Sequence, residues 1–157
     1  MADLVIRPLE AADEAAWHPL FAGYRRFYEQ PEDEAMQRVV WDWLMDPAHA
    51  LAGMVAAEED GTLLGLAHWH VWPSTLGATH VGYLSDLFVD PAARGRQVGK
   101  QLYEAMLDVC RRESWPALTL LTQEGNTVGR SLYDQYASVT DFRLYSGPVG
   151  DSSASDA

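Results

Sequence analysis

The sequence has few features that would crosslink the chain or place it in a membrane. Cys110 is the only cysteine, so an internal disulfide is excluded. No apolar run is long enough to cross a bilayer, and residues 1–10 carry early charges instead of the basic start and apolar block of a secretion signal. We therefore expect a cytoplasmic protein without a membrane partner.

Basic residues are also scarce. The chain has 11 Lys and Arg against 23 Asp and Glu, which gives a formal net charge of −12. Binding to nucleic acid or to an anionic membrane needs an extended basic face, so the charge argues against both partners. The short basic segment at residues 94–100 is a local exception to this balance.

The length and the apolar content of the chain are sufficient for one folded domain. The 157 residues include 48% apolar side chains and six tryptophans, which supports a sizeable core. We expect one domain at residues 1–147. Residues 148–157 are rich in Gly, Ser and Asp and are expected to form a disordered tail.

Apolar periodicity and turn residues predict an alternation of strands and helices. Strands are expected at residues 3–8, 51–59, 62–72, 79–89, 118–122 and 138–146; helices are expected at residues 10–29, between Pro31 and Pro47, from residue 98 onward and around Leu132. The order β-α-α-β-β-β-α-β-α-β predicts an α/β (α+β) fold, with a mixed, mostly antiparallel sheet flanked by helices. Helical spacing assigns Trp17 and Tyr24 to the core of this fold.

A glycine-bearing basic loop lies between the strand that ends at Asp90-Pro91 and the next helix. It reads Arg94-Gly95-Arg96-Gln97-Val98-Gly99-Lys100. Unpaired amides and the dipole at the start of that helix favour a bound anion, and the basic side chains add to this. The sequence therefore predicts a site for a phosphate or pyrophosphate.

Two nucleotide-binding fingerprints do not fit the loop. The Walker loop needs four residues between its glycines and a Ser or Thr after the lysine, but three residues separate Gly95 from Gly99, and Gln101 follows Lys100. The dinucleotide fingerprint needs a glycine where Gln97 stands. ATP and a dinucleotide are thus disfavoured as ligands.

The stretch resembles the coenzyme A loop of the GNAT-type N-acetyltransferases, whose pattern is Arg/Gln-x-x-Gly-x-Gly/Ala after a strand that ends in Leu-x-Val. Arg94, Gly99 and the run Leu87-Phe88-Val89 match that pattern, and Gln97 departs from it. The predicted element order also matches this family. The resemblance covers about a third of the chain and implies a GNAT-type fold.

The resemblance implies an enzyme that moves an acetyl group from acetyl-CoA to a primary amine of a small molecule or protein in a ternary complex. It assigns the backbone of Leu87, Phe88 and Val89 to the pantetheine arm and thioester. It assigns the pyrophosphate to the amides of Gly95, Arg96, Gln97, Val98, Gly99 and Lys100. Asn126 would contact the coenzyme and Tyr133 would protonate the thiolate, while Tyr28 and Glu29 would border the acceptor site. Family habit also implies a homodimer.

The general base is less clear, because Ser85 stands where many relatives carry a glutamate. Ser85 could order a water that relays the proton, with Asp86, His68, His70 or Glu124 as the final acceptor. His68 and His70 share one strand face, yet two histidines without a clear third ligand make a poor metal site. We predict no metal, and a structural or proton-transfer role for the pair.

Two departures from the family pattern leave an alternative open. Ser85 and Gln97 are also compatible with a non-catalytic, regulatory domain of the same fold that binds acyl-CoA.

Overall fold

The computed structural model describes residues 3–150, which fall into two compact units with described parts at residues 3–124 and 125–150. The expected domain at residues 1–147 and the expected tail at 148–157 stay predictions, and residues 151–157 lie outside the described part. No helix among the described residues is long and apolar enough to cross a membrane. A cytoplasmic location also stays a prediction.

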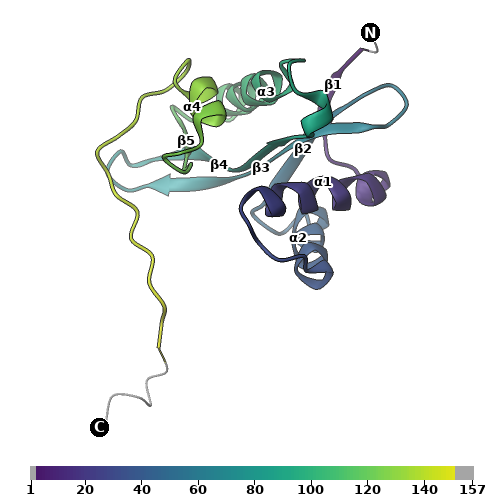
Figure 1. The fold of residues 1–157 in the computed structure, drawn as a ribbon. Helices are drawn as coiled ribbons and strands as arrows, with labels where there is room; N and C mark the ends of the chain where they lie inside the picture. The colour runs from purple at the N-terminus through teal and green to yellow at the C-terminus, as the bar shows by residue number, and fades with distance from the viewer. Residues whose placement is uncertain (1–2, 151–157) are drawn as a thin grey trace. The chain divides into compact units, whose positions relative to one another are not determined.

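The first unit is built on a five-stranded sheet with the order β1-β2-β3-β4-β5. The strands are β1 (Val5–Pro8), β2 (Ala52–Ala57), β3 (Leu63–Ser74), β4 (Thr79–Val89) and β5 (Leu118–Leu120). Neighbours from β1 to β4 run antiparallel, whereas β4 and β5 run parallel. The mixed, mostly antiparallel sheet predicted from the sequence is therefore confirmed (Figure 1).

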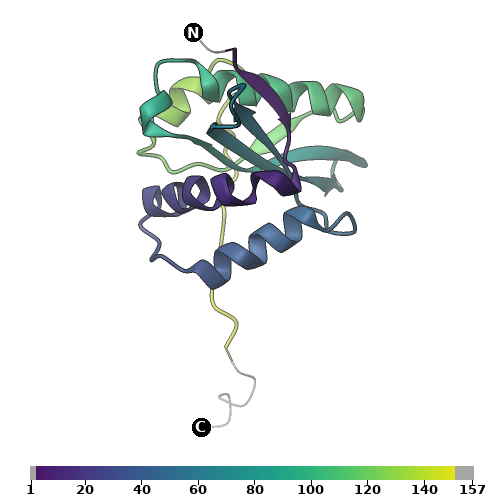
Figure 2. The same cartoon turned by 90° about the vertical axis from the view of Figure 1, so that its right-hand side faces the viewer.

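Helices cover both faces of this sheet (Figures 1 and 2). One face carries α1 (Glu14–Phe27) and α2 (Glu34–Met45), preceded by the short 3₁₀ turn η1 (Ala11–Asp13). The other face carries α3 (Val98–Arg112), which follows the 3₁₀ turn η2 (Pro91–Ala93). The helix α3 approaches closely because Gly65 has no side chain; a Cβ there would lie 3.0 Å from Val98 Cγ1 and Leu102 Cδ1.

The core on the α1 side combines aromatic and aliphatic side chains. It joins α1 and α2 to the strands through Trp17, Leu20, Phe21, Trp41, Val55, Ala57, Leu63, Leu66 and Phe88. Trp17 stacks on Phe21 with 4.7 Å between ring centroids. This packing fixes α1 against the centre of the sheet, where β3 and β4 meet.

The second unit contains α4 (Thr127–Tyr133) and then an irregular segment. The strand expected at residues 138–146 is wrong, because the structure places no strand or helix at residues 138–150. The alternating apolar side chains remain exposed, and Phe142 is 77% exposed. Within the described part of this unit there is no other strand to pair with, so alternation alone does not produce a ladder.

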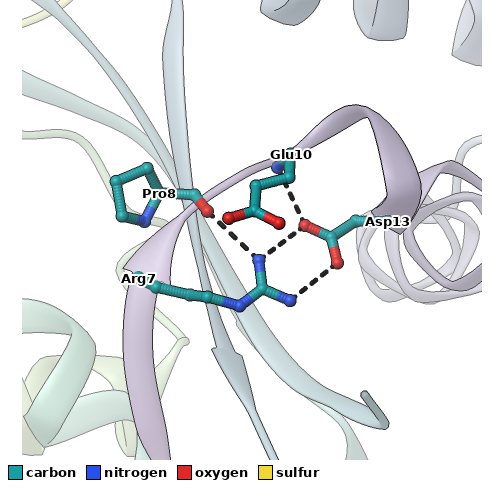
Figure 3. A network of polar contacts seen from close by, with 4 residues as sticks. All are labelled: Arg7, Pro8, Glu10 and Asp13. Carbon is teal, nitrogen blue, oxygen red and sulfur yellow. Dashed lines mark hydrogen bonds and ion pairs between the residues drawn. The ribbon is translucent and has the colours of Figure 1, made fainter.

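An ion pair anchors the entry into α1 (Figure 3). Both terminal nitrogens of Arg7 donate to the Asp13 carboxylate at 2.8 Å, and the amide of Glu10 donates to Asp13 Oδ2 at 2.8 Å. Asp13 is buried, and Arg7 also donates to the carbonyl of Pro8. The network ties β1 to the turn that leads into the helix.

We expect Asp13→Ala to lower the free energy of unfolding by about 2–3 kcal/mol at neutral pH, because it leaves Arg7 without its partner. The hydrogen bonds from Arg7 hold the pKa of Asp13 below its ordinary value. The stabilisation is therefore present above the unfolded-state pKa and is lost as pH falls through the lowered folded-state pKa. Urea unfolding of wild type and variant at several pH values measures this difference.

The matched control is Asp108→Ala, which removes an exposed pair with Arg111 and should cost under about 1 kcal/mol. An Asp13→Ala loss no larger than that of the control would contradict an anchoring role for the network.

Candidate active site

The strand β4 is interrupted by a β-bulge. Asp86 pairs with His68 and Leu84 pairs with Trp69, so Ser85 is an extra residue on β4. The strand β5 pairs with β4 only at Gly82, Tyr83 and Leu84. Beyond the bulge, residues 86–89 of β4 pair with β3 alone among the described strands. Because β5 ends opposite Leu84, the other edge of this part of β4 is left unpaired for another extended chain.

The predicted pantetheine residues lie on this unpaired part of β4. The Phe88 side chain is buried in the core against α1, so only its backbone can serve a ligand. Tyr24 of α1 donates to the backbone carbonyl of Ser85 at 3.5 Å. Leu87 and Val89 are half-buried. The backbone roles predicted for Leu87, Phe88 and Val89 are compatible with this arrangement.

The basic loop between the end of β4 and the start of α3 contains two residues in the left-handed backbone conformation. Gly95 has φ +83°, and Gln97 has φ +60° and ψ +26° as the residue before the first turn of α3. The carbonyl of Gln97 accepts from the amide of Gln101 at 3.0 Å, but no side chain caps the start of the helix. The amides of the first turn, at Val98, Gly99 and Lys100, therefore lie where an anion can accept from them.

The basic side chains of the loop have different surroundings. Arg96 donates to Glu58 at 2.6 Å, so its guanidinium is held by the end of β2. Arg94 and Lys100 form no ion pair with another residue of the described chain. Positive charge for an anion at this loop would therefore come mainly from Arg94 and Lys100, and Arg96 would act through its backbone.

The conformation of Gln97 has a cost, because a non-glycine residue in the left-handed region is strained by about 1–2 kcal/mol. We expect Gln97→Gly to raise the free energy of unfolding by about 0.5–1 kcal/mol, after the larger chain entropy of glycine offsets part of the gain. Urea denaturation measures the change. Gln97→Ala is the matched control, since alanine keeps the strain, and equal stability of the two variants would contradict this account.

On the α1 face, a chain of hydrogen bonds runs from α1 to β4. Trp17 Nε1 lies 3.1 Å from His68 Nε2, and His68 Nδ1 lies 2.8 Å from Asp86 Oδ2. Trp17 and His68 are both 0% exposed, whereas the Asp86 side chain is 19% exposed. Of the predicted base candidates, Asp86 is therefore the one that combines this buried support with access to solvent.

Two tyrosines interact electrostatically with Asp86. Burial raises the pKa of Tyr28, the negative charge of Asp86 adds to this, and a hydrogen bond with Thr122 opposes it. Burial and Asp86 likewise raise the pKa of Tyr83, whose ring stacks on His70 at 4.9 Å between centroids. Both phenols stay protonated at neutral pH, so they can donate hydrogen bonds.

Part of this site was predicted from the sequence, namely Asp86 and, by family resemblance, Tyr28. Tyr83 as a neighbour of Asp86 and Trp17 as a hydrogen-bond donor to His68 were missed. Neither had a local signal. Regular alternation would place Tyr83 and Asp86 on opposite faces of the strand, and the bulge at Ser85 that breaks this alternation is not visible in the sequence. Trp17 lies 51 residues from His68.

The predicted residues of the second unit lie at the two ends of α4. The side chain of Asn126 caps the helix by accepting from the amide of Gly129 at 3.2 Å. Tyr133 is the last residue of the helix, and its carbonyl accepts from the amides of Tyr136 and Ala137. Their roles toward a coenzyme stay predictions.

Comparison with known proteins gives consistent matches. The model of the acetyltransferase (GNAT) family matches residues 17–137. The chain is 32% identical to the uncharacterized N-acetyltransferase YhfO of Bacillus subtilis (strain 168), over 89% of this chain and 94% of that protein. It is 29% identical to the D-amino-acid N-acetyltransferase HPA3 of Saccharomyces cerevisiae, over 90% of this chain and 89% of that protein.

A solved structure shares the fold. The ribosomal-protein-alanine N-acetyltransferase from Brucella melitensis biovar Abortus 2308 superposes with a TM-score of 0.79 at 24% identity, over 94% of this chain and 100% of that one. The fold, the open edge of β4 and these matches define an acetyltransferase. The chain belongs to the acetyltransferase (GNAT) family, which confirms the prediction from its loop and element order.

Proposed function

We propose that this acetyltransferase takes its acetyl group from acetyl-CoA and passes it to a primary amine by direct attack in a ternary complex. The observation that carries the proposal is the open edge of β4. This edge has the solvent-accessible Asp86 beside its bulge and is followed by the uncapped start of α3. A donor along this edge and an amine at Asp86 would be held side by side, which is the main requirement for a reaction between two substrates.

The loop fits the pyrophosphate of coenzyme A. Its left-handed residues Gly95 and Gln97 turn the chain into α3, whose first amides have no side-chain cap. Arg94 and Lys100 supply positive charge in a chain with a net charge of −12. When bound, acetyl-CoA supplies the acetyl group as an activated thioester. The chain would hold it through backbone groups of residues 85–89 and of the loop, with Asn126 as a further contact.

At the amine end, Asp86 would accept one proton from the ammonium form of the acceptor, and the neutral amine would form the new C–N bond as the C–S bond breaks. The bulge residue Ser85 can order a water beside this carboxylate. Tyr133 would give its proton to the departing sulfur. The proton taken up by Asp86 then passes to solvent, and the second proton lost by the nitrogen restores the one that Tyr133 gave to the sulfur. One proton is therefore released in each turnover.

The surroundings of Asp86 favour a cationic acceptor. A carboxylate that interacts with Tyr28 and Tyr83 offers one negative charge and neighbouring hydrogen-bonding groups to an ammonium. Amines of small molecules and of proteins both carry a positive charge in their ammonium form, so either class could bind here. The name of the yeast relative makes D-amino acids the first acceptors to test, followed by polyamines, aminoglycosides and lysine peptides.

Thermal unfolding with acetyl-CoA, coenzyme A and ATP tests the donor. A ligand at one hundred times its dissociation constant adds about 2.7 kcal/mol of stability, so both coenzyme A species should raise Tm and ATP should not. Release of free thiol with the amine panel then tests the acceptor. Stabilisation by acetyl-CoA without thiol release from any amine would overturn the proposed activity in favour of a regulatory acyl-CoA-binding domain.

A further inference from the structure

His68 has both ring nitrogens engaged at a site with no solvent access. Its Nε2 lies 3.1 Å from Trp17 Nε1, its Nδ1 lies 2.8 Å from Asp86 Oδ2, and the residue is 0% exposed. The reaction described above gives His68 no task. A buried histidine in line with the candidate base nevertheless constrains that base.

The partners of His68 define where its proton lies. The indole nitrogen of tryptophan is a donor only, so Nε2 of His68 must accept and carries no proton. The single ring proton is then on Nδ1, which donates to Asp86 Oδ2. A positively charged imidazolium would have no acceptor to offer Trp17. His68 is therefore a neutral ring with its proton on Nδ1.

The same bonds distinguish the two oxygens of Asp86. Oδ2 accepts from His68, while Oδ1 makes no hydrogen bond to another residue of the described chain. Because Oδ2 already accepts from Nδ1–H, a proton that Asp86 takes up is favoured at Oδ1. The bond to His68 can persist through this uptake, so the carboxyl group need not rotate.

The ring itself has little freedom to move. Its centroid lies 5.8 Å from that of Trp17 and 5.5 Å from that of Phe21. On the neighbouring strand it faces Gly53, where an added Cβ would lie 3.3 Å from His68 Cδ2. Contact with aromatic rings on α1 and with a glycine on β2 holds the imidazole in one orientation.

We propose that His68 is a positioning residue. Supported by Trp17, it holds Asp86 through Oδ2 so that Oδ1 is presented to the acceptor amine, and His68 itself carries no proton between substrate and solvent. This assignment rests on the proposed role of Asp86. Tyr28 and Tyr83 are further titratable groups that interact with Asp86, and His70 is stacked on Tyr83.

Nitrogen NMR of wild-type protein labelled at histidine tests the proton position without any substitution. At neutral pH, Nδ1 of His68 should show the shift of a protonated nitrogen and Nε2 that of an unprotonated one. Assignment comes from the spectrum of His68→Asn. A proton on Nε2, or on both nitrogens, would overturn the proposal even if acetyl transfer is established.

Two variants test the positioning itself. His68→Asn places an amide N–H where Nδ1–H stood, whereas His68→Phe keeps a ring but has no donor; both lose the acceptor for Trp17. We expect His68→Phe to lower kcat by about 10- to 100-fold with KM for acetyl-CoA within about twofold. His68→Asn should recover kcat to within about threefold of wild type.

The comparison separates positioning from simple structural support. Equal kcat values for the two variants, or a His68→Phe enzyme as active as wild type, would overturn the proposal. If a variant has a Tm below the assay temperature, the variant and the wild type are both assayed at a lower temperature, where the variant is folded. An inactive wild type would count against the proposed function, whereas the NMR result would still decide the arrangement of the ring.

Discussion

Gly99→Glu is expected to abolish binding of acetyl-CoA. Gly99 lies in the uncapped first turn of α3, where the amides and the helix dipole favour an anion. A glutamate there places a carboxylate where the pyrophosphate would bind, and its charge repels the ligand. Titration calorimetry should detect no binding at concentrations that saturate wild type.

The same substitution should leave the fold intact or make it more stable. Glutamate is a better helix former than glycine, and a negative charge at a helix N-terminus stabilises the helix by about 0.3–1 kcal/mol. We therefore expect Tm without ligand to be unchanged or higher, while the Tm rise with acetyl-CoA disappears. Gly99→Ala is the control that adds a side chain without charge and should keep most of the affinity. Wild-type affinity in Gly99→Glu would contradict the loop assignment.

The parts of the molecule that the sequence predicts well are those with local signals. Asp90-Pro91 ends β4 because proline supplies no ladder donor, and apolar spacing after Val98 predicts α3. The glycine-bearing loop between them identifies an anion site from a few adjacent residues. Such features depend on neighbours within about one turn of chain, so one sequence is enough to find them.

The support of Asp86 could not be found in this way. His68 lies 18 residues from Asp86 and 51 from Trp17, and their meeting depends on the register of β3 against β4 and on the packing of α1. The bulge at Ser85 shifts that register by one residue. Periodicity shows that a side chain faces a helix, but it cannot show which side chain of the helix it meets.

Two other features, an ion pair of the basic loop and the C-terminal segment, also depend on long-range contacts that the sequence does not show. Arg96 has the same local context as Arg94, yet it pairs with Glu58, 38 residues earlier, through the packing of the loop on the β2 end. The run at residues 138–146 alternates well enough for a strand, but it has no strand partner within its own unit in the described chain. Pairing is a long-range property, and alternation is only one of its requirements.

Asp86→Asn is expected to lower kcat by about 10²- to 10⁴-fold, the range typical for loss of a general base. Asparagine has the same shape, and its carbonyl oxygen can still accept from His68, so the fold and the loop should be unaffected. KM for acetyl-CoA should therefore stay within about twofold of wild type. Steady-state kinetics with the best amine of the panel measures both parameters, and Asp108→Asn on the exposed face of α3 is the matched control.

The pH dependence of this variant gives a sharper result than the rate alone. Without a carboxylate to take the proton, the acceptor must enter already neutral, and the neutral fraction of an alkyl amine rises tenfold with each pH unit below its pKa. We expect log kcat/KM of Asp86→Asn to rise with a slope near one up to the amine pKa, with a shallower rise in wild type. Turnover within about threefold of wild type, with the same pH profile, would remove Asp86 from the mechanism and leave water ordered by Ser85 or His70 as the proton acceptor.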